Sequence, residues 1–235
     1  MISHKHKCIF IHISKCAGSS IEKVFGLDIA DNSEKNNKNL FGWNKEHNLY
    51  LQHATPQELL DYGFITKEQW NDYYKFIIVR NPWDRALSDY IWMSKEINKS
   101  DSFKSFINKK GPFLEVLTQK DGKQYRGDHL NKQLDYFYID GEEVKYDKII
   151  RFESLKNELP VLFKELNIKI DLESEKHNVG KKIFSHYSKF YNSYRKRLIH
   201  DNYENDIDYL KYKFEDKKTF FDHIKLFQSS KQLIK

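Results

Sequence analysis

Cysteine, glycine and proline are scarce in this chain of 235 residues, which has two, nine and four of them respectively. Two cysteines do not make a disulfide framework, and neither Cys8 nor Cys16 belongs to a Cys-x-x-Cys or Cys/His zinc pattern. Few glycines and prolines, beside abundant lysine and asparagine, favour helices over a β-sandwich. The apolar run at residues 8–13 is too short for a signal sequence or a membrane span. We therefore expect a cytoplasmic protein with reduced thiols and no transmembrane segment.

The length and the apolar content favour one domain, residues 1–235, with a sizeable core. Hydrophobic residues make up 39% of the chain and aromatic residues 15%, enough to exclude wholesale disorder. The net charge of +6 favours anionic partners such as nucleotides, sulfated or carboxylated sugars, nucleic acid or acidic lipids. A lysine-rich solvated surface gives the same charge, so charge alone does not choose among these partners.

Short apolar runs alternate with helical patterns along the chain. The predicted strands are residues 8–13, 48–53, 76–79 and 146–152. Helices are predicted after them, from Ser19, from Thr55, from Pro82 to Glu96 and from near Pro160. A helical C-terminal region is predicted from a packing stripe at helical spacing: Tyr187, Phe190, Tyr191, Tyr194 and Leu198. Repeated strand–helix units predict an α/β fold, with a P-loop-like three-layer core and a mainly parallel sheet.

Local signals mark helix starts and loops within this pattern. Ser19 and Glu22 stand at capping-box spacing. Thr55, before proline and three residues before Glu58, is a predicted N-cap, and so is Asn81. Polar segments predict surface loops at residues 31–45, 98–102 and 120–128.

The first candidate site is the string from Ser14 to Ser20, between a predicted strand and a predicted helix. A helix N-terminus presents N–H groups and a partial positive charge to an anion. Gly18 lets the backbone approach a phosphate, and Lys15 can neutralise it. Because this lysine precedes the glycine by three residues, the string is not a Walker A motif. A capped helix with an exposed lysine would explain the same string.

The second candidate site is the string from Phe76 to Tyr90, where Arg80 ends a predicted strand. Open α/β sheets bind ligands at the carboxyl edge, and the arginine fork matches phosphate oxygens. Ser88 lies about two turns into the next helix and offers a hydroxyl donor. The alternative gives Arg80 a structural salt bridge and leaves Ser88 on a plain helix surface.

Together these strings resemble the two nucleotide-binding motifs of sulfotransferases that use PAPS (3′-phosphoadenosine 5′-phosphosulfate). The string at Arg80 resembles their 3′-phosphate motif, and the string at Lys15 their 5′-phosphosulfate loop, with Ser14 and Cys16 as departures. The chain is most similar to the carbohydrate-type branch, which includes heparan 2-O and chondroitin sulfotransferases and small bacterial members. Residues 148–155 and 177–182 resemble further segments of that branch.

The resemblance implies a role for each matching residue. Lys15 would contact the 5′-phosphate and the bridging oxygen, and so take part in catalysis. The 5′-phosphosulfate would be bound by Ala17, Gly18, Ser19 and Ser20. Arg80 and Ser88 would bind the 3′-phosphate, and Lys181 or Lys182 would close over the nucleotide. The product would be PAP (3′-phosphoadenosine 5′-phosphate), the acceptor a hydroxyl of a glycan, and no metal is required.

The candidate general base is His53, which ends a predicted strand just before a capped helix. Histidine titrates near neutrality and accepts a hydroxyl proton readily. Bacterial members of the family carry a similar His-Ala-Thr string. His12 and His47 hold weaker positions, and His177 is the next candidate.

Two other classes of function remain open at this stage. A nucleotide kinase or other phosphoryl transferase would need a Walker A lysine and a metal-binding carboxylate, and neither is clear. A basic nucleic-acid-binding module would need a coherent basic face, which only residues 195–197 approach. We therefore do not expect a nucleic-acid partner.

Overall fold

The computed structural model describes residues 1–27, 38–168 and 183–222. Contacts within the chain divide it into two compact units. The first unit is Met1–Arg80 with Phe113–Asn178, and the second is Asn81–Pro112 with Val179–Lys235. The single domain expected from the sequence stays a prediction.

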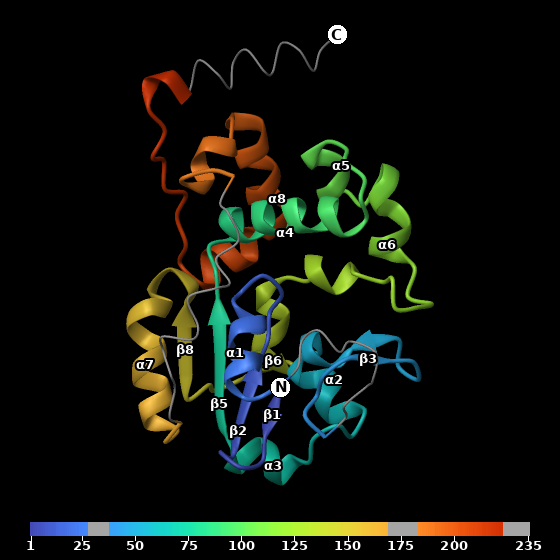
Figure 1. Cartoon of the computed structure of the whole chain (residues 1–235), viewed down its shortest axis with the longest axis vertical. Helices are drawn as coiled ribbons and strands as arrows, with labels where there is room; N and C mark the ends of the chain where they lie inside the picture. Colours follow the sequence, from blue (N-terminus) through green and yellow to red (C-terminus); the bar gives the residue numbers. More distant parts are fainter. Residues whose placement is uncertain (28–37, 169–182, 223–235) are drawn as a thin grey trace. The chain divides into compact units, whose positions relative to one another are not determined.

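A four-stranded sheet lies at the centre of the first unit (Figure 1). Its strands, in spatial order, are β1 (Ile2–Ser3), β2 (Cys8–Ile11), β5 (Tyr74–Val79) and β8 (Lys148–Arg151). The pairs β2–β5 and β5–β8 are parallel, and β1 is an antiparallel edge strand. The mainly parallel sheet predicted from the sequence is therefore confirmed.

Continuous burial explains why these short runs form strands. Every residue of β2 is buried, and so are the last four residues of β5. Runs of isoleucine, phenylalanine and valine with both faces covered are typical of parallel strands. Ile11 pairs with Ile77, and Val79 pairs with Arg151, so the three parallel strands end at one edge of the sheet.

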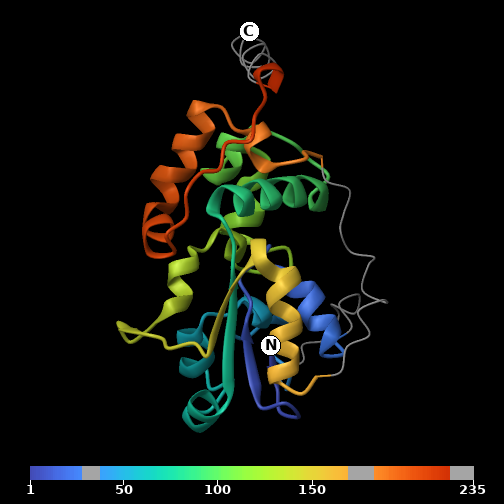
Figure 2. The ribbon, with the colours of Figure 1, turned by 90° about the vertical axis from the view of Figure 1, so that its left-hand side faces the viewer.

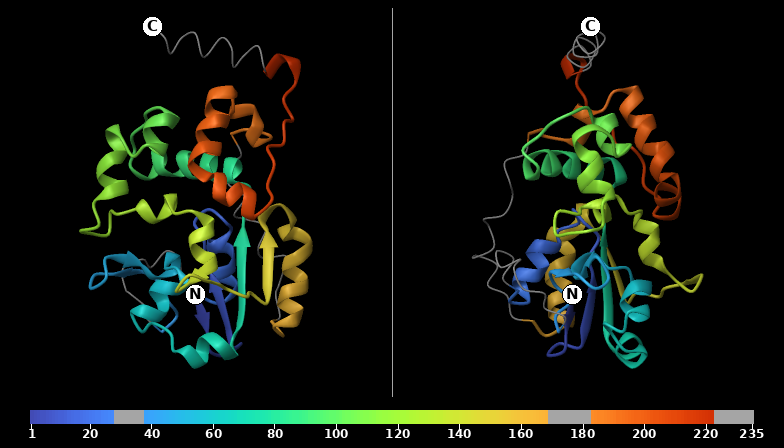
Figure 3. Two further views of the ribbon diagram at one scale, coloured as in Figure 1. Left: turned by 180° about the vertical axis from the view of Figure 1, so that it is seen from behind. Right: turned by 90° about the vertical axis from the view of Figure 1, so that its right-hand side faces the viewer.

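The first unit also contains helices and 3-10 turns. The helices are α1 (Gly18–Val24), α2 (Pro56–Asp61), α3 (Lys67–Asp72), α6 (Leu114–Thr118) and α7 (Leu155–Glu165). The 3-10 turns are η1 (Leu51–His53), η3 (Gly127–Leu130), η4 (Gln133–Phe137) and η5 (Phe152–Ser154). Figure 2 and Figure 3 show α1 and α7 on one face of the sheet, with α2 and η4 on the other. The flanking helices predicted from the sequence are thus confirmed.

Two small antiparallel pairs complete the first unit. They are β3 (Trp43–Asn44) with β4 (Leu49–Tyr50), and β6 (Tyr138–Ile139) with β7 (Glu142–Glu143). Residues 48–53 were expected to form one strand, but the strand ends at Tyr50 and a 3-10 turn follows. Within the described part of the chain this strand pairs with β3 alone, so η1 is not a direct extension of the central sheet.

The second unit is helical. It contains α4 (Pro82–Glu96), α5 (Phe103–Ile107), η6 (Tyr187–Phe190) and α8 (Ser193–Tyr209), and η2 (Gly111–Phe113) spans its boundary. The indole N–H of Trp83 donates to the carbonyl of Lys196 at 3.0 Å, and the Tyr191 hydroxyl donates to the carbonyl of Trp83 at 2.7 Å. The predicted packing stripe holds for Tyr187, Phe190 and Tyr191, which are buried, but Tyr194 is exposed.

Several predicted boundaries shift in the structure. The first strand ends at Ile11 and the last covers only Lys148–Arg151, shorter than expected. The helix predicted from near Pro160 begins at Leu155 and contains that proline. A proline in a helix removes one backbone hydrogen bond and crowds the preceding turn, and α7 accommodates it in its second turn.

The capping signals have mixed outcomes. Thr55 and Glu58 form a complete capping box, and Asn81 caps α4 through the Trp83 N–H. Ser19 is not a cap, because α1 begins one residue before it and its N-cap is Ala17 in a left-handed conformation. Over residues 1–27, 38–168 and 183–222, the longest helices are too short or too polar to cross a membrane.

We predict that Thr55→Ala lowers the free energy of unfolding by about 1 kcal/mol. The Thr55 hydroxyl accepts from the Glu58 N–H at 3.2 Å, and alanine leaves that N–H without its cap. Urea denaturation with an unchanged slope measures the effect. Thr55→Ser is the matched control because it keeps the hydroxyl, and equal loss in both variants would contradict the capping role.

Candidate active site

The loop between β2 and α1 is shaped by two left-handed residues. Lys15 has φ of 63° and Ala17 has φ of 65°, on either side of Cys16. Backbones that alternate into the left-handed region form concave surfaces whose N–H groups bind anions. The loop leads into the first turn of α1 at Gly18. Its shape therefore fits the 5′-phosphosulfate loop implied by the sequence.

Arg80 joins this loop to the end of β5. Its Nη1 donates to the carbonyl oxygen of Lys15 at 2.7 Å. Its guanidinium carbon lies 3.9 Å from the ring centroid of Phe152, which follows β8. Residues after all three parallel strands thus meet at one edge, as the sheet topology requires.

Gln133 fixes the backbone of Arg80 from η4. Its side-chain amide donates to the Arg80 carbonyl at 2.8 Å and accepts the Arg80 N–H at 2.9 Å. The Cys16 thiol lies 4.0 Å from the same amide oxygen. Gln133 and Cys16 are both fully buried, so the amide links the loop to the strand end inside the protein.

His12 lies just after β2 and connects the loop to a buried histidine cluster. Its Nδ1 is 2.9 Å from Oε1 of Glu22 in α1. A Cβ added at Gly18 would lie 1.8 Å from the Nε2 of His12. The imidazole therefore fills the space that a side chain at Gly18 would need. His12 is thus both packed and hydrogen-bonded.

His53, the candidate base, is the last residue of η1 and is nearly enclosed. Its Nδ1 makes a hydrogen bond with Oδ2 of Asp128, and the two side chains are only 10% and 11% exposed. The ring of His12 stands edge-on to it at 4.7 Å between centroids, and the ring of His129 at 5.2 Å.

Asp128 comes from η3, within the segment 120–128 that we expected to be a surface loop. That expectation is wrong for its last residues, since Asp128 is buried beside His53. No periodic pattern marks this carboxylate, because η3 is a short 3-10 turn and its partner lies 75 residues earlier. Glu22 and His129 were missed as well, and the Gly127-Asp128-His129 string was the only available signal.

Burial controls the ionisation of this cluster. It lowers the pKa of His53 to about 4, although the Asp128 carboxylate acts in the opposite direction. For Asp128, burial opposes ionisation, but the adjacent His53 outweighs it and the pKa of the carboxyl is lowered. His53 is thus neutral and Asp128 ionised at neutral pH. The expectation that His53 titrates near neutrality is corrected by its burial.

One group of side chains is close enough to hold a metal ion. Ligand atoms of His53, Asp128 and His129 all lie within 4.8 Å of one another, within the described part of the chain. In the present arrangement His53 and Asp128 bind each other directly. Nitrogen and oxygen ligands of this kind suit zinc.

A comparison with known protein families identifies the family of the chain. The profile described as the sulfotransferase family matches residues 1–213. The chain belongs to this family. Neither a curated protein nor a solved structure matches the chain significantly. Membership in the family implies transfer of a sulfuryl group.

Other predicted site residues of this sulfotransferase are not brought into the same cluster. Ser88 lies in α4, in the second unit, so its joint action with Arg80 stays a prediction. Lys181 and Lys182, with His177, lie outside the described residues. His47 packs against Tyr62, with ring centroids 4.1 Å apart, and its Nδ1 is 3.3 Å from Asn44.

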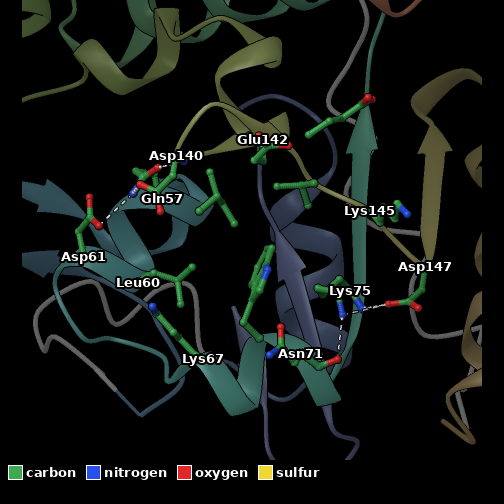
Figure 4. Close-up of a pocket in the computed structure, with 14 residues that line it drawn as sticks. Gln57, Leu60, Asp61, Lys67, Asn71, Lys75, Asp140, Glu142, Lys145 and Asp147 are labelled. Carbon is green, nitrogen blue, oxygen red and sulfur yellow. Dashed lines mark hydrogen bonds and ion pairs between the residues drawn. The ribbon is translucent and has the colours of Figure 1, made fainter.

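A separate pocket of about 670 Å³ lies at the other end of β5 (Figure 4). Its charged lining consists of Asp61, Lys67, Lys75, Asp140, Glu142, Glu143, Lys145 and Asp147. Lys75 lies near the start of β5, five residues before Arg80, and forms an ion pair with Asp147. With five acidic and three basic groups, this lining does not suit a polyanionic nucleotide.

We predict that Gly18→Ala destabilises the protein by about 1–3 kcal/mol, because the new methyl group overlaps the His12 ring. The matched comparison is the same change in a His12→Ala background, where the methyl group has room. Chemical denaturation of the four proteins in this double-mutant cycle gives the coupling. An equal loss in both backgrounds would show that His12 is not the obstacle.

Proposed function

We propose that this enzyme transfers the sulfuryl group of PAPS to a hydroxyl group of a carbohydrate, with His53 as the general base. The observation that carries the proposal is the meeting of the Lys15 loop, Arg80 and the His53 cluster within one unit. The Ser14 hydroxyl donates to the carbonyl of His129 at 3.1 Å, and the His12 ring lies against both Gly18 and His53. The Lys15 loop and the His53 cluster are thus in direct contact.

Binding of the donor is assigned to the loop and to Arg80. PAPS, when bound, supplies an activated sulfuryl group on a phosphate leaving group. Lys15, Ala17, Gly18, Ser19 and Ser20 surround the 5′ end of the nucleotide in this proposal. Arg80 binds the 3′-phosphate, and the roles that the resemblance implies for Ser88, Lys181 and Lys182 stay predictions. Arginine has five N–H donors, so Arg80 can hold the Lys15 carbonyl and a phosphate together.

Lys15 stabilises the charge that develops on the leaving phosphate. Preorganised cations aimed at a developing charge lower a barrier without reorganisation during the reaction. The bond from Arg80 to the Lys15 carbonyl supports this role because it fixes the backbone that carries the ammonium group.

His53 removes the proton from the acceptor hydroxyl. Its Nδ1 is engaged by Asp128, which leaves Nε2 as the atom for the acceptor. A pKa of about 4 keeps the ring neutral over the ordinary range of pH, so the base is always in its active form. The carbohydrate acceptor follows from the sequence resemblance to the carbohydrate-type branch.

We predict that PAP stabilises the protein more than ATP or single-stranded RNA does. Ligand at a hundredfold above its Kd gives about 2.7 kcal/mol of stabilisation. Calorimetric titration should show that Arg80→Ala weakens PAP binding about 10- to 100-fold, because a charge-assisted hydrogen bond contributes about 1.5–3 kcal/mol.

The control is Lys67→Ala, which removes one positive charge at the pocket of Figure 4 and should leave PAP affinity unchanged. Tighter binding of ATP than of PAP would contradict PAPS as the donor and favour a phosphoryl transferase. Tighter binding of RNA would favour the nucleic-acid module.

We predict that His53→Ala lowers single-turnover sulfation about 10²- to 10⁴-fold at saturating PAPS, with PAP affinity near that of the parent. The parent rate should fall only on the acid side of about pH 4, since the ring must be unprotonated to act as a base. A parent profile that falls below pH 6.5 would instead indicate an exposed imidazole. Unchanged turnover in the variant would move the role of base to another group.

A further inference from the structure

The imidazole of His53 is held by a carboxylate from a distant part of the sequence. Asp128 accepts the hydrogen bond at Nδ1 with Oδ2, and its other oxygen, Oδ1, is buried with no hydrogen-bond partner among the described residues. The hydrogen bond to His53 is therefore the main interaction that the structure describes for this carboxylate. A buried carboxylate of this kind orients a histidine and selects which nitrogen carries the proton.

Two further contacts anchor the turn that carries His53. The Tyr136 hydroxyl donates to the His53 carbonyl at 3.0 Å. Arg126, two residues before Asp128, donates from Nη1 to the Tyr50 hydroxyl at 2.8 Å, and Tyr50 directly precedes η1. These contacts connect the backbone near His53 with the backbone near Asp128, on either side of the hydrogen bond between the two side chains.

The segment leading to Asp128 is closely packed at Gly127. A Cβ added at Gly127 would lie 2.4 Å from the Tyr125 hydroxyl and 2.5 Å from the carbonyl of Leu117. Tyr125 packs in a buried cluster with Trp43 and Tyr50, the strand residues before η1. Close packing on this scale restricts movement of the backbone that carries Asp128.

We propose that Asp128 is a positioning residue for the proposed reaction: it keeps the proton of neutral His53 on Nδ1, so that Nε2 faces the acceptor hydroxyl as the base. This inference rests on the proposed role of His53. In the reaction the acceptor proton moves to Nε2, the acceptor oxygen forms the bond to sulfur, and the bond from sulfur to the leaving phosphate oxygen breaks. Asp128 stays ionised and stabilises the imidazolium that results.

Other charged and titratable groups face the ring without competing for Nδ1. His12 and His129 contact it edge-on from the β2–α1 connection and from η3. Glu22 in α1 is bound to His12, and Arg126 lies near the Asp128 carboxylate. Tyr50 stands 6.4 Å away between centroids. Glu22 thus bonds to His12, and Asp128 bonds to His53.

Direct contact between His53 and Asp128 also argues against a shared metal ion. Two ligand atoms about 2.1 Å from one tetrahedral zinc lie about 3.4 Å apart. The imidazole nitrogen and the carboxylate oxygen lie at hydrogen-bonding distance instead. Bringing an ion between them would require the anchored turns to move apart.

The test compares Asp128→Asn with the full-length parent enzyme. An amide can donate to Nδ1 and so move the imidazole proton to Nε2, which removes the base from the acceptor side. We expect turnover at saturating PAPS to fall by at least about 10-fold and up to about 10⁴-fold, the loss seen when a catalytic histidine loses its carboxylate. Asp128→Glu, which keeps the charge, should recover part of the rate.

Imidazole ¹⁵N chemical shifts report the proton position without any need for activity. We expect Nδ1–H at His53 in the parent and Nε2–H in Asp128→Asn. Glu22→Gln is the matched control, since it makes the same chemical change at the other histidine–carboxylate couple. Its His53 proton should remain on Nδ1.

The outcomes separate this inference from the function on which it rests. Parent-like turnover in Asp128→Asn, with His53→Ala inactive, would overturn the positioning role and leave the base intact. A parent His53 protonated on Nε2 would overturn it as well. If a chelator abolished turnover and zinc restored it, the positioning role would be wrong and His53 and Asp128 would belong to a metal site. Full activity of His53→Ala would refute the proposed base itself, and the ¹⁵N shifts would still report on the couple.

Discussion

Parallel pairing of β2 with β5, and of β5 with β8, brings three strand ends to one edge of the central sheet. The residues that follow these ends are the Lys15 loop, Arg80 and Phe152. Arg80 contacts both of the others, because the parallel register brings the strand ends together. Fully buried apolar side chains on both faces of β2 and β5 pack in this register and maintain it. The packing of the core strands thus determines the geometry of the proposed site.

Hydrogen bonds within the protein hold the site together before any ligand binds. Gln133 fixes the Arg80 backbone, Arg80 fixes Lys15, and two carboxylates fix two histidines. Such preorganisation matters for group transfer, because groups that are already oriented need no rearrangement in the transition state. Burial serves the same end by keeping the imidazole of His53 neutral.

The sequence predicts the parts of this site that follow local rules. Strand–helix alternation indicates the parallel sheet, and the position of Arg80 after an apolar run places it at the carboxyl edge. The carboxylates Glu22 and Asp128 escape such reasoning, because their partners are chosen by tertiary packing across 10 and 75 residues. Ser19 and Glu22 even matched a capping pattern, yet a left-handed Ala17 starts the helix and frees Glu22 for His12.

Cys16 illustrates how the fold shields chemistry that the sequence alone would leave open. The thiol stands within the proposed phosphate loop, where the motifs that it resembles have serine or threonine. It is 0% exposed and directed at the amide of Gln133, and Cys8 is equally enclosed, with burial raising the pKa of its thiol to about 12. Thiolates are the reactive form of cysteine, and neither sulfur meets solvent in the native fold. Oxidants and alkylating agents therefore reach these sulfurs only when the core opens, which makes thiol labelling a direct gauge of local unfolding at the nucleotide loop.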